Sequence, residues 1–284
     1  MSIQRPRMCV LWRAMVVVAV VASPLCAQER VHRGLSASPS VSMRVFVPSG
    51  KVRIAVWNRD SIDVSGTVSA TGSVFGGGSR EYAKFGVEPL RTGDTRLPDA
   101  DLVVTVPRAA HIWVKMTAGT IETDGTSGEI ELYTVGGRIA VQRASGVTSV
   151  ESIDASVSIS ASRGDIRVRG GKGVLQLIDV AGTASVTSVS GRVEIRGGSA
   201  PEGRIEAIGG DIAIDVPQLK GVVLDLQTHS GAISAVVRRN AVPLLDLVSR
   251  SGRVTNASPP GQRVNGSITA RSFRGPITID LRAQ

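Results

Sequence analysis

A nine-residue unit repeats between Gly119 and Gly198, and it limits this chain to a narrow set of folds. Within a unit, apolar or small residues stand at the third and fifth positions with a polar residue between them, as in Ile166-Arg167-Val168. Such period-two alternation is typical of a half-buried β-strand. Because one short strand cannot bury its apolar side alone, repeats of this kind stack into a solenoid. The units begin at Gly119, Gly128, Gly137, Gly146, Ala155, Gly164, Gly173, Gly182 and Gly191.

Glycine at the start of most units predicts a turn there, because glycine enters positive φ at little cost. Beyond Gly198 the same start recurs at Gly210, Gly231, Gly252 and Gly275, with spacings of 21, 21 and 23 residues. These longer repeats are interpreted as whole coils with larger turns. The sequence therefore predicts an all-β, single-chain β-solenoid with about 18–21 residues per coil and two short strands per coil in the regular part.

One continuous domain is expected over residues 41–284. It divides into irregular N-terminal coils, 41–118, and regular β-solenoid repeats, 119–284. Residues 28–40 lack periodicity and are predicted to form an extended linker. Residues 73–100 contain three consecutive glycines and several prolines, and they are predicted to form a loop insertion in the coils.

Residues 1–27 have the pattern of a secretory signal peptide. A basic start is followed by the apolar run 14–22, and cleavage is expected after Ala27. The run is too short for a membrane-spanning helix, which needs about 20 apolar residues. Cys26 leaves a lipid-modified amino terminus as an alternative. The protein is therefore expected to be exported to the periplasm, the cell surface or the medium, with no transmembrane span in the mature chain.

Few residues suited to catalysis are present. Both cysteines, Cys9 and Cys26, fall within the signal segment, so the mature chain has no disulfide or thiol chemistry. The three histidines, His32, His111 and His229, are far apart in sequence. No catalytic, cofactor-binding or metal-binding residue is expected, and no cofactor.

Paired carboxylates on adjacent coils would indicate a glycan-cleaving enzyme. Residues 18 apart should stack, so the row of Glu122 can be read directly as Glu122, Ala140, Ser158, Gln176 and Glu194. No neighbouring coils carry paired acids in the regular part.

Composition narrows the class of partner. Without residues 1–27, 30 basic and 24 acidic residues give a net charge of +6. This mild excess is explained by solubility, and tolerance of anionic surfaces is the alternative. Aromatic residues make up 3% of the chain, and the nine-residue repeats between Gly119 and Gly198 contain Tyr133 alone. Because aromatic residues do not alternate with compact basic patches, nucleic acid is not an expected partner.

The 73–100 segment has the residue types that dominate protein interfaces, namely aromatic rings beside arginine. It is interpreted as a possible interaction loop for a macromolecule of the cell envelope or surface, a protein or a glycan. A surface loop with no binding role is the alternative. The candidate contact residues are Arg80, Tyr82, Lys84, Phe85 and Arg91.

Several motifs together resemble an exported bacterial family labelled "putative adhesins". They are the strand 50–56, the strand 101–107 that ends in proline, and repeats such as 134–141 and 188–195. The resemblance covers approximately residues 41–281. It implies a β-solenoid without known catalytic residues or cofactors. The function expected from it is a non-enzymatic exported scaffold for macromolecular interaction. A polysaccharide-active β-helix enzyme and a purely structural periplasmic protein are the alternatives.

Mass spectrometry of the exported protein should give an amino terminus at or near Gln28, because the signal segment ends there. An intact Met1 would contradict export with cleavage. A diacylglyceryl mass on Cys26 would instead show a lipoprotein.

Overall fold

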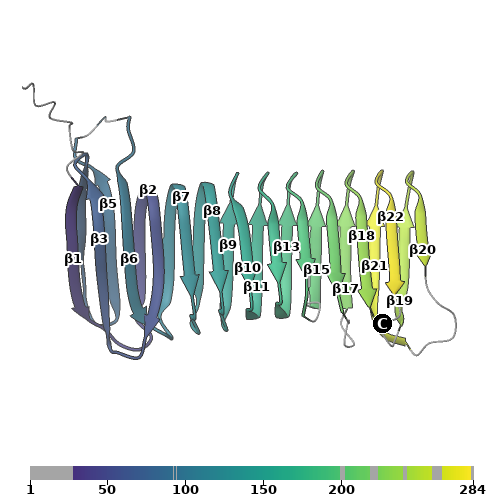
Figure 1. Ribbon diagram of the computed structural model, residues 1–284, viewed down its shortest axis with the longest axis horizontal. Helices are drawn as coiled ribbons and strands as arrows, with labels where there is room; N and C mark the ends of the chain where they lie inside the picture. The colour runs from purple at the N-terminus through teal and green to yellow at the C-terminus, as the bar shows by residue number, and fades with distance from the viewer. Residues whose placement is uncertain are drawn as a thin grey trace, which may run out of the picture.

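The computed structural model describes residues 28–282 except 92, 94, 199–201, 218–222, 239–241 and 258–263, and the expected signal peptide lies outside these residues. Every secondary-structure element among them is a β-strand, which confirms the all-β prediction (Figure 1). The first eleven strands are β1 (Gln28–Ser36), β2 (Ser42–Trp57), β3 (Ser61–Ser69), β4 (Gly72–Gly78), β5 (Tyr82–Pro89), β6 (Asp99–Pro107), β7 (His111–Asp124), β8 (Ile130–Gln142), β9 (Val147–Ser152), β10 (Ser156–Ser160) and β11 (Arg163–Gly170). The others are β12 (Leu175–Ile178), β13 (Ala181–Ser188), β14 (Val193–Arg196), β15 (Glu202–Ala207), β16 (Ile212–Val216), β17 (Val223–Thr228), β18 (Ile233–Arg238), β19 (Val242–Ser249), β20 (Val254–Ala257), β21 (Val264–Ser272) and β22 (Ile277–Arg282).

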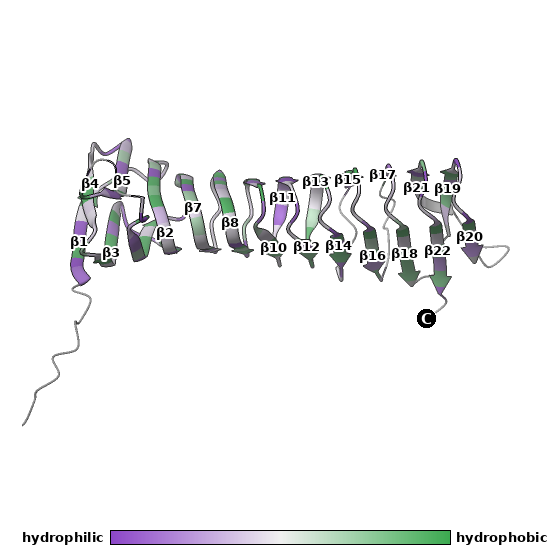
Figure 2. Ribbon diagram, turned by 90° about the horizontal axis from the view of Figure 1, so that it is seen from above, coloured by the Kyte–Doolittle hydropathy of each residue, from purple (hydrophilic) through white to green (hydrophobic). Residues whose placement is uncertain are grey.

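The strands form two facing layers of a β-solenoid, seen edge-on in Figure 2. In the regular part each strand pairs in parallel with the strand one coil away, so Ile139 lies beside Val157 and Val157 beside Leu175. These partners are 18 residues apart, which confirms the predicted coil. Layer 1 contains, in order, β4 and β5, then the first halves of the three strands β2, β7 and β8, and then β9, β11, β13, β15, β17, β21 and β19. Layer 2 contains β1, β3 and β6, then the second halves of β2, β7 and β8, and then β10, β12, β14, β16, β18, β22 and β20.

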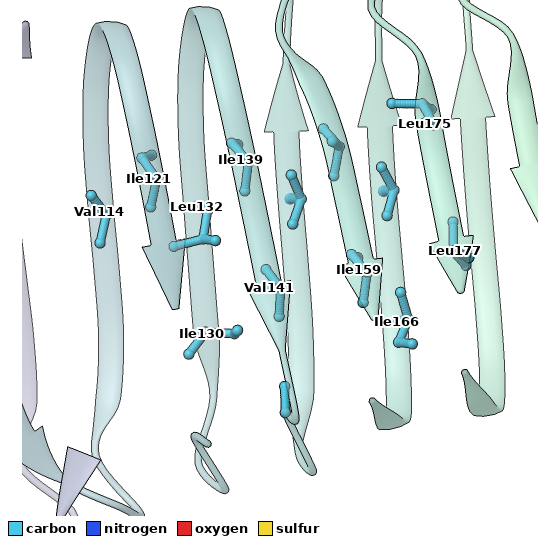
Figure 3. Close-up of a cluster of buried hydrophobic side chains, with 14 of the residues drawn as sticks. Val114, Ile121, Ile130, Leu132, Ile139, Val141, Ile159, Ile166, Leu175 and Leu177 are labelled. Atoms are coloured by element: carbon cyan, nitrogen blue, oxygen red, sulfur yellow. The ribbon is translucent and has the colours of Figure 1, made fainter. Parts of the chain in front are cut away.

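The core lies between the two layers and is built from columns of branched aliphatic side chains (Figure 3). Ile121, Ile139 and Leu175 are almost completely buried in layer 2, and Ile166 is 0% exposed in layer 1. Burying one such side chain contributes about 1.5–3 kcal/mol. The inward phase expected from the alternation is confirmed.

Glycine at the coil corners is required mainly by close contact between coils. A Cβ on Gly137, which has φ 108°, would lie 1.9 Å from the carbonyl oxygen of Gly119. Gly191 has no positive φ, yet its Cβ would lie 2.0 Å from the carbonyl oxygen of Gly173. The sequence-based explanation by positive φ therefore holds at Gly137 but not at Gly191, where the backbone of the next coil leaves no room.

Buried hydroxyl groups form hydrogen bonds at the same corners. Ser188 Oγ donates to the carbonyl oxygen of Gly191 at 2.7 Å. In later coils Thr228 accepts from the backbone N–H of Gly231 at 3.0 Å. These bonds pair backbone groups of the turn that would otherwise be buried without a partner. They account for the recurring Ser/Thr-x-x-Gly spacing.

At the C-terminal end the coils do not stack in chain order. Strand β21 pairs with β17 on one side and with β19 on the other, and β22 lies likewise between β18 and β20. The last coil of the sequence is therefore the second coil from the end of the stack (Figure 1). The corner glycines follow this order, since Gly275 packs on Gly231, and Gly252 packs on Gly275.

The expected linker at 28–40 is corrected by the structure. Residues Gln28–Ser36 form β1, which pairs antiparallel with β3 along its whole length. Val31 is buried at 7% exposure and Ala37 at 0%. The alternation was too sparse to detect because β1 is an edge strand with mostly exposed residues.

The expected loop insertion at 73–100 is also largely strand. Strands β4 and β5 form an antiparallel hairpin, and β5 continues layer 1 beside β2. Gly76, Gly77 and Gly78 lie within β4 and pair with β5, although such a glycine run usually indicates a turn. The described part of 90–98 is the remaining connection between β5 and β6.

Replacing Ile166 by Asp should destabilise the protein by several kcal/mol, because it places an unpaired charge between the layers. Replacing the outward neighbour Arg167 by Ser should change stability by less than about 0.5 kcal/mol. Urea unfolding followed by circular dichroism measures both. Equal midpoints for parent and Ile166→Asp would contradict the inward assignment.

Replacing Gly191 by Ala should destabilise the stack by about 2 kcal/mol, because the added methyl overlaps backbone of the adjacent coil. Gly136→Ala is the matched control, since nothing lies within 4 Å of its Cβ position. Thermal unfolding should separate the two variants. A Gly191→Ala midpoint equal to that of the control would argue against the close packing at the corner.

Candidate functional site

The outer surface of layer 1 at the N-terminal end carries a concentration of rings and cations. Five of the nine aromatic residues of the chain lie there, together with three basic side chains. We call this surface the aromatic–cationic face. It consists of Arg44, Phe46, Phe75, Tyr82, Lys84, Trp113, Lys115 and Tyr133.

Strand register brings these residues together from five strands. Trp113 of β7 lies beside Arg44 of β2, and Lys115 lies beside Phe46. On the other side of β2, Lys84 of β5 pairs with Arg44. All of these positions are outward because their neighbours along each strand point into the core.

Gly86, which has no side chain, leaves room on the sheet for one of the rings. Phe75 is opposite Gly86 in the β4–β5 hairpin, and its ring occupies the space that a side chain at Gly86 would fill, 2.3 Å from the Cβ position. Phe46 is the partner of Gly86 on the other side. Phe46 also contacts Trp113, with ring centroids 4.9 Å apart. The rings therefore form a nearly continuous apolar surface across four strands.

The cations lie directly over the rings. Lys84 Nζ is 5.0 Å from the ring centroid of Phe46 and 5.1 Å from that of Phe75. Lys115 Nζ is 5.2 Å from the centroid of Tyr133. The attraction between a cation and the ring face stabilises these arrangements. The face thus offers apolar contact area and positive charge within the same small surface.

The five predicted contact residues do not all lie on the aromatic–cationic face. Tyr82, 39% exposed, and Lys84 belong to the face. Arg80 is exposed in the turn next to it, and Arg91 is exposed beyond the opposite end of β5. Phe85 is corrected, because it is 3% exposed and packs in the core, where it cannot contact a partner.

Sequence reasoning did not find the other rings of the face. Phe46 and Trp113 are 67 positions apart in the sequence and become neighbours only through the pairing of β2 with β7. The available signal was their outward phase in otherwise apolar strands. Tyr133 is the one ring of the nine-residue repeats between Gly119 and Gly198, so the sequence shows it without a neighbouring ring.

The three histidines, which could act in catalysis, contact different partners. His32 contacts Asp63 at 2.7 Å, His111 contacts Glu129 at 3.3 Å, and His229 stacks on Phe273. Within the described part of the chain, no cluster of three His, Cys, Asp or Glu side chains could hold a metal ion. No helix long and apolar enough to cross a membrane occurs among the described residues.

The fold and the face define a two-layer β-solenoid protein with an outward aromatic–cationic surface. Residues 50–283 match the family model described as Toastrack DUF4097, and the chain belongs to this family. The family resemblance drawn from the strand and repeat motifs is confirmed. A comparison with curated proteins finds no match.

Two solved structures are similar over most of the chain. One is described as a putative adhesin from Bacteroides fragilis, with a TM-score of 0.45, 12% identity, and 90% of this chain and 98% of that chain covered. The other is described as a putative cell adhesion protein from Clostridium sporogenes, with a TM-score of 0.29, 8% identity, and 89% and 100% covered.

Replacing Lys84 by Gln should destabilise the protein by about 1 kcal/mol, because Phe46 and Phe75 both lose the cation above them. Lys172→Gln is the control, since its ammonium lies 3.8 Å from an Asp154 carboxylate oxygen at an exposed site. Such a surface pair contributes less than about 1 kcal/mol. Urea midpoints of the two variants should differ. A control variant as unstable as Lys84→Gln would argue against the ring contacts.

Proposed function

We propose that this protein is a non-enzymatic, exported interaction scaffold that binds a macromolecule of the cell envelope or surface. The aromatic–cationic face is the binding surface. The observation that supports this most directly is the gathering of five rings and three cations on one side of the N-terminal coils. Elsewhere among the described residues, rings on the outer surface are few and separate.

The chemistry of the face suits a partner with acidic groups next to apolar groups. Rings supply contact area at a low cost in conformational entropy, and they dominate interface energetics. The ammonium groups of Lys84 and Lys115 are exposed, so they can pair with carboxylates of a partner while remaining over the rings. A rigid sheet holds all of these groups in place before binding, which reduces the entropy lost on association.

Export is part of this proposal and rests on the signal pattern of residues 1–27. Adhesion is a specific form of the same function. The solved structures described as putative adhesins suggest it as the role to test.

A polysaccharide-active enzyme is the alternative that the solenoid fold and the sequence leave open. Incubation with a panel of acidic glycans and assay for new reducing ends separates the two. We expect none. New reducing ends that disappear in a variant of one acidic residue would establish an enzyme instead.

The binding surface is tested with Tyr82→Ser/Tyr133→Ser, which removes two outward rings. Partners captured by the parent protein from envelope extract should be lost or reduced at least tenfold, as measured by quantitative mass spectrometry. Both positions are at the surface, so the variant should retain the parent circular dichroism spectrum.

The matched control is Phe273→Ser, which removes a ring of similar exposure, 37%, at the other end of the rod. It should keep the captured partners. Loss of the same partners in both variants, or in neither, would remove the aromatic–cationic face from consideration.

A further inference from the structure

The outer surface of layer 2, on the opposite side of the same coils, has a second feature that the proposed function does not use. A groove of about 910 Å³ lies over β2, β7 and β8. It is open because small side chains, such as Ala55 and Ala140, stand at outward positions where longer residues would fill it. We call it the basic groove. Its charged residues are Lys51, Arg53, Arg108, Arg138, Arg143, Glu122 and Asp124.

Positive charge exceeds negative charge in this groove by three. Lys51 and Arg53 share one carboxylate, Glu122, at 2.9 and 3.4 Å. Arg143 pairs with Asp124. Five cations thus face two carboxylates.

Two of the arginines have no carboxylate partner among the residues that the structure describes. Arg108 donates to the carbonyl oxygen of Gly125 at 2.8 Å. Arg138 is exposed and makes no ion pair with any residue that the structure describes. Both guanidinium groups are therefore available to an anionic ligand.

Glu122 lies in the groove between two of its cations, Lys51 and Arg53. The hydrogen bond from Lys51, with the charges of Lys51 and Arg53, lowers the pKa of Glu122 below its ordinary value, against the opposing effect of burial. Glu122 therefore stays ionised at neutral pH and occupies part of the site. An incoming anion has to compete with it for Lys51 and Arg53.

The spacing of the cations favours a sparsely charged polymer. Outward residues on one strand are about 7 Å apart and neighbouring strands about 4.8 Å apart. A duplex nucleic acid carries one charge per roughly 1.7 Å of its axis, which is much denser than this pattern. A polyuronate carries one carboxylate per sugar ring. Its hydroxyl groups can also bond to the neutral polar groups of the groove, Thr120 and Gln142.

We propose that the basic groove binds an acidic polysaccharide of the uronate type. Arg138 and Arg108 pair with carboxylates, because the planar guanidinium matches a carboxylate in two parallel hydrogen bonds. Lys51 and Arg53 neutralise a further carboxylate. Glu122 limits the affinity by holding these two cations in the free protein.

Binding of polygalacturonate by the full chain tests the proposal, measured by calorimetry at low and physiological salt. Lys51→Gln/Arg138→Gln should weaken binding at least tenfold. Arg163→Gln/Arg169→Gln removes the same charge from exposed positions outside the groove and should change affinity less than twofold. Equal losses in the two double variants would show a general charge effect and overturn the site.

A variant that is expected to gain affinity tests the site independently of misfolding, because a misfolded protein would lose affinity. Glu122→Gln leaves Lys51 and Arg53 without their internal carboxylate, so polygalacturonate should bind several-fold more tightly. Unchanged or weaker binding by this folded variant would overturn the proposal.

The ligand class is tested with two further polymers. Fully methyl-esterified polygalacturonate has the same backbone without charge and should not bind. Inorganic polyphosphate should bind more weakly than polygalacturonate; equal or tighter binding would overturn the assignment to a uronate. Tyr82→Ser/Tyr133→Ser should keep its affinity for polygalacturonate, so failure here is distinguishable from failure of the proposed function.

Discussion

The close contact between successive backbones at the coil corners is the constraint on which the rest of the structure depends. With carbonyl oxygens about 2 Å from where a Cβ would stand, as at Gly137 and Gly191, neither corner accepts a side chain. Parallel pairing then fixes the register at 18 residues per coil in the regular part. Because the register is fixed, inward residues of successive coils lie over one another, and columns of mainly Ile, Val and Leu run along the rod.

The same register decides what the outer surface can do. Outward residues one coil apart become direct neighbours, so adjacent strands of one layer combine their side chains into one surface. Along the described part of the regular rod many outward charges pair with opposite charges; Arg204, for example, contacts Glu206 and Asp225. On the N-terminal coils the balance differs on both layers. Rings and cations gather on layer 1, and excess arginine on layer 2 lines a groove, so both proposed binding surfaces lie on the N-terminal coils.

The ends of the stack follow different rules from its middle. Strands β1, β3 and β4 run antiparallel to their neighbours, and the final coil, β21–β22, is inserted before β19–β20. Interior coils are covered on both sides by copies of themselves, whereas an end has a neighbour on one side only. Repeat identity alone therefore does not determine how an end is built.

The sequence by itself determined the all-β solenoid, the 18-residue coil and the inward phase of residues such as Ile166, because period-two alternation and corner glycine are local signals. It also placed Tyr82 and Lys84 among the contact candidates. Only the tertiary structure decided that β1 is a strand, that Phe85 is buried, and that Phe46 meets Trp113. These depend on pairings between distant strands, and alternation shows which side a residue faces but not which strand lies beside it.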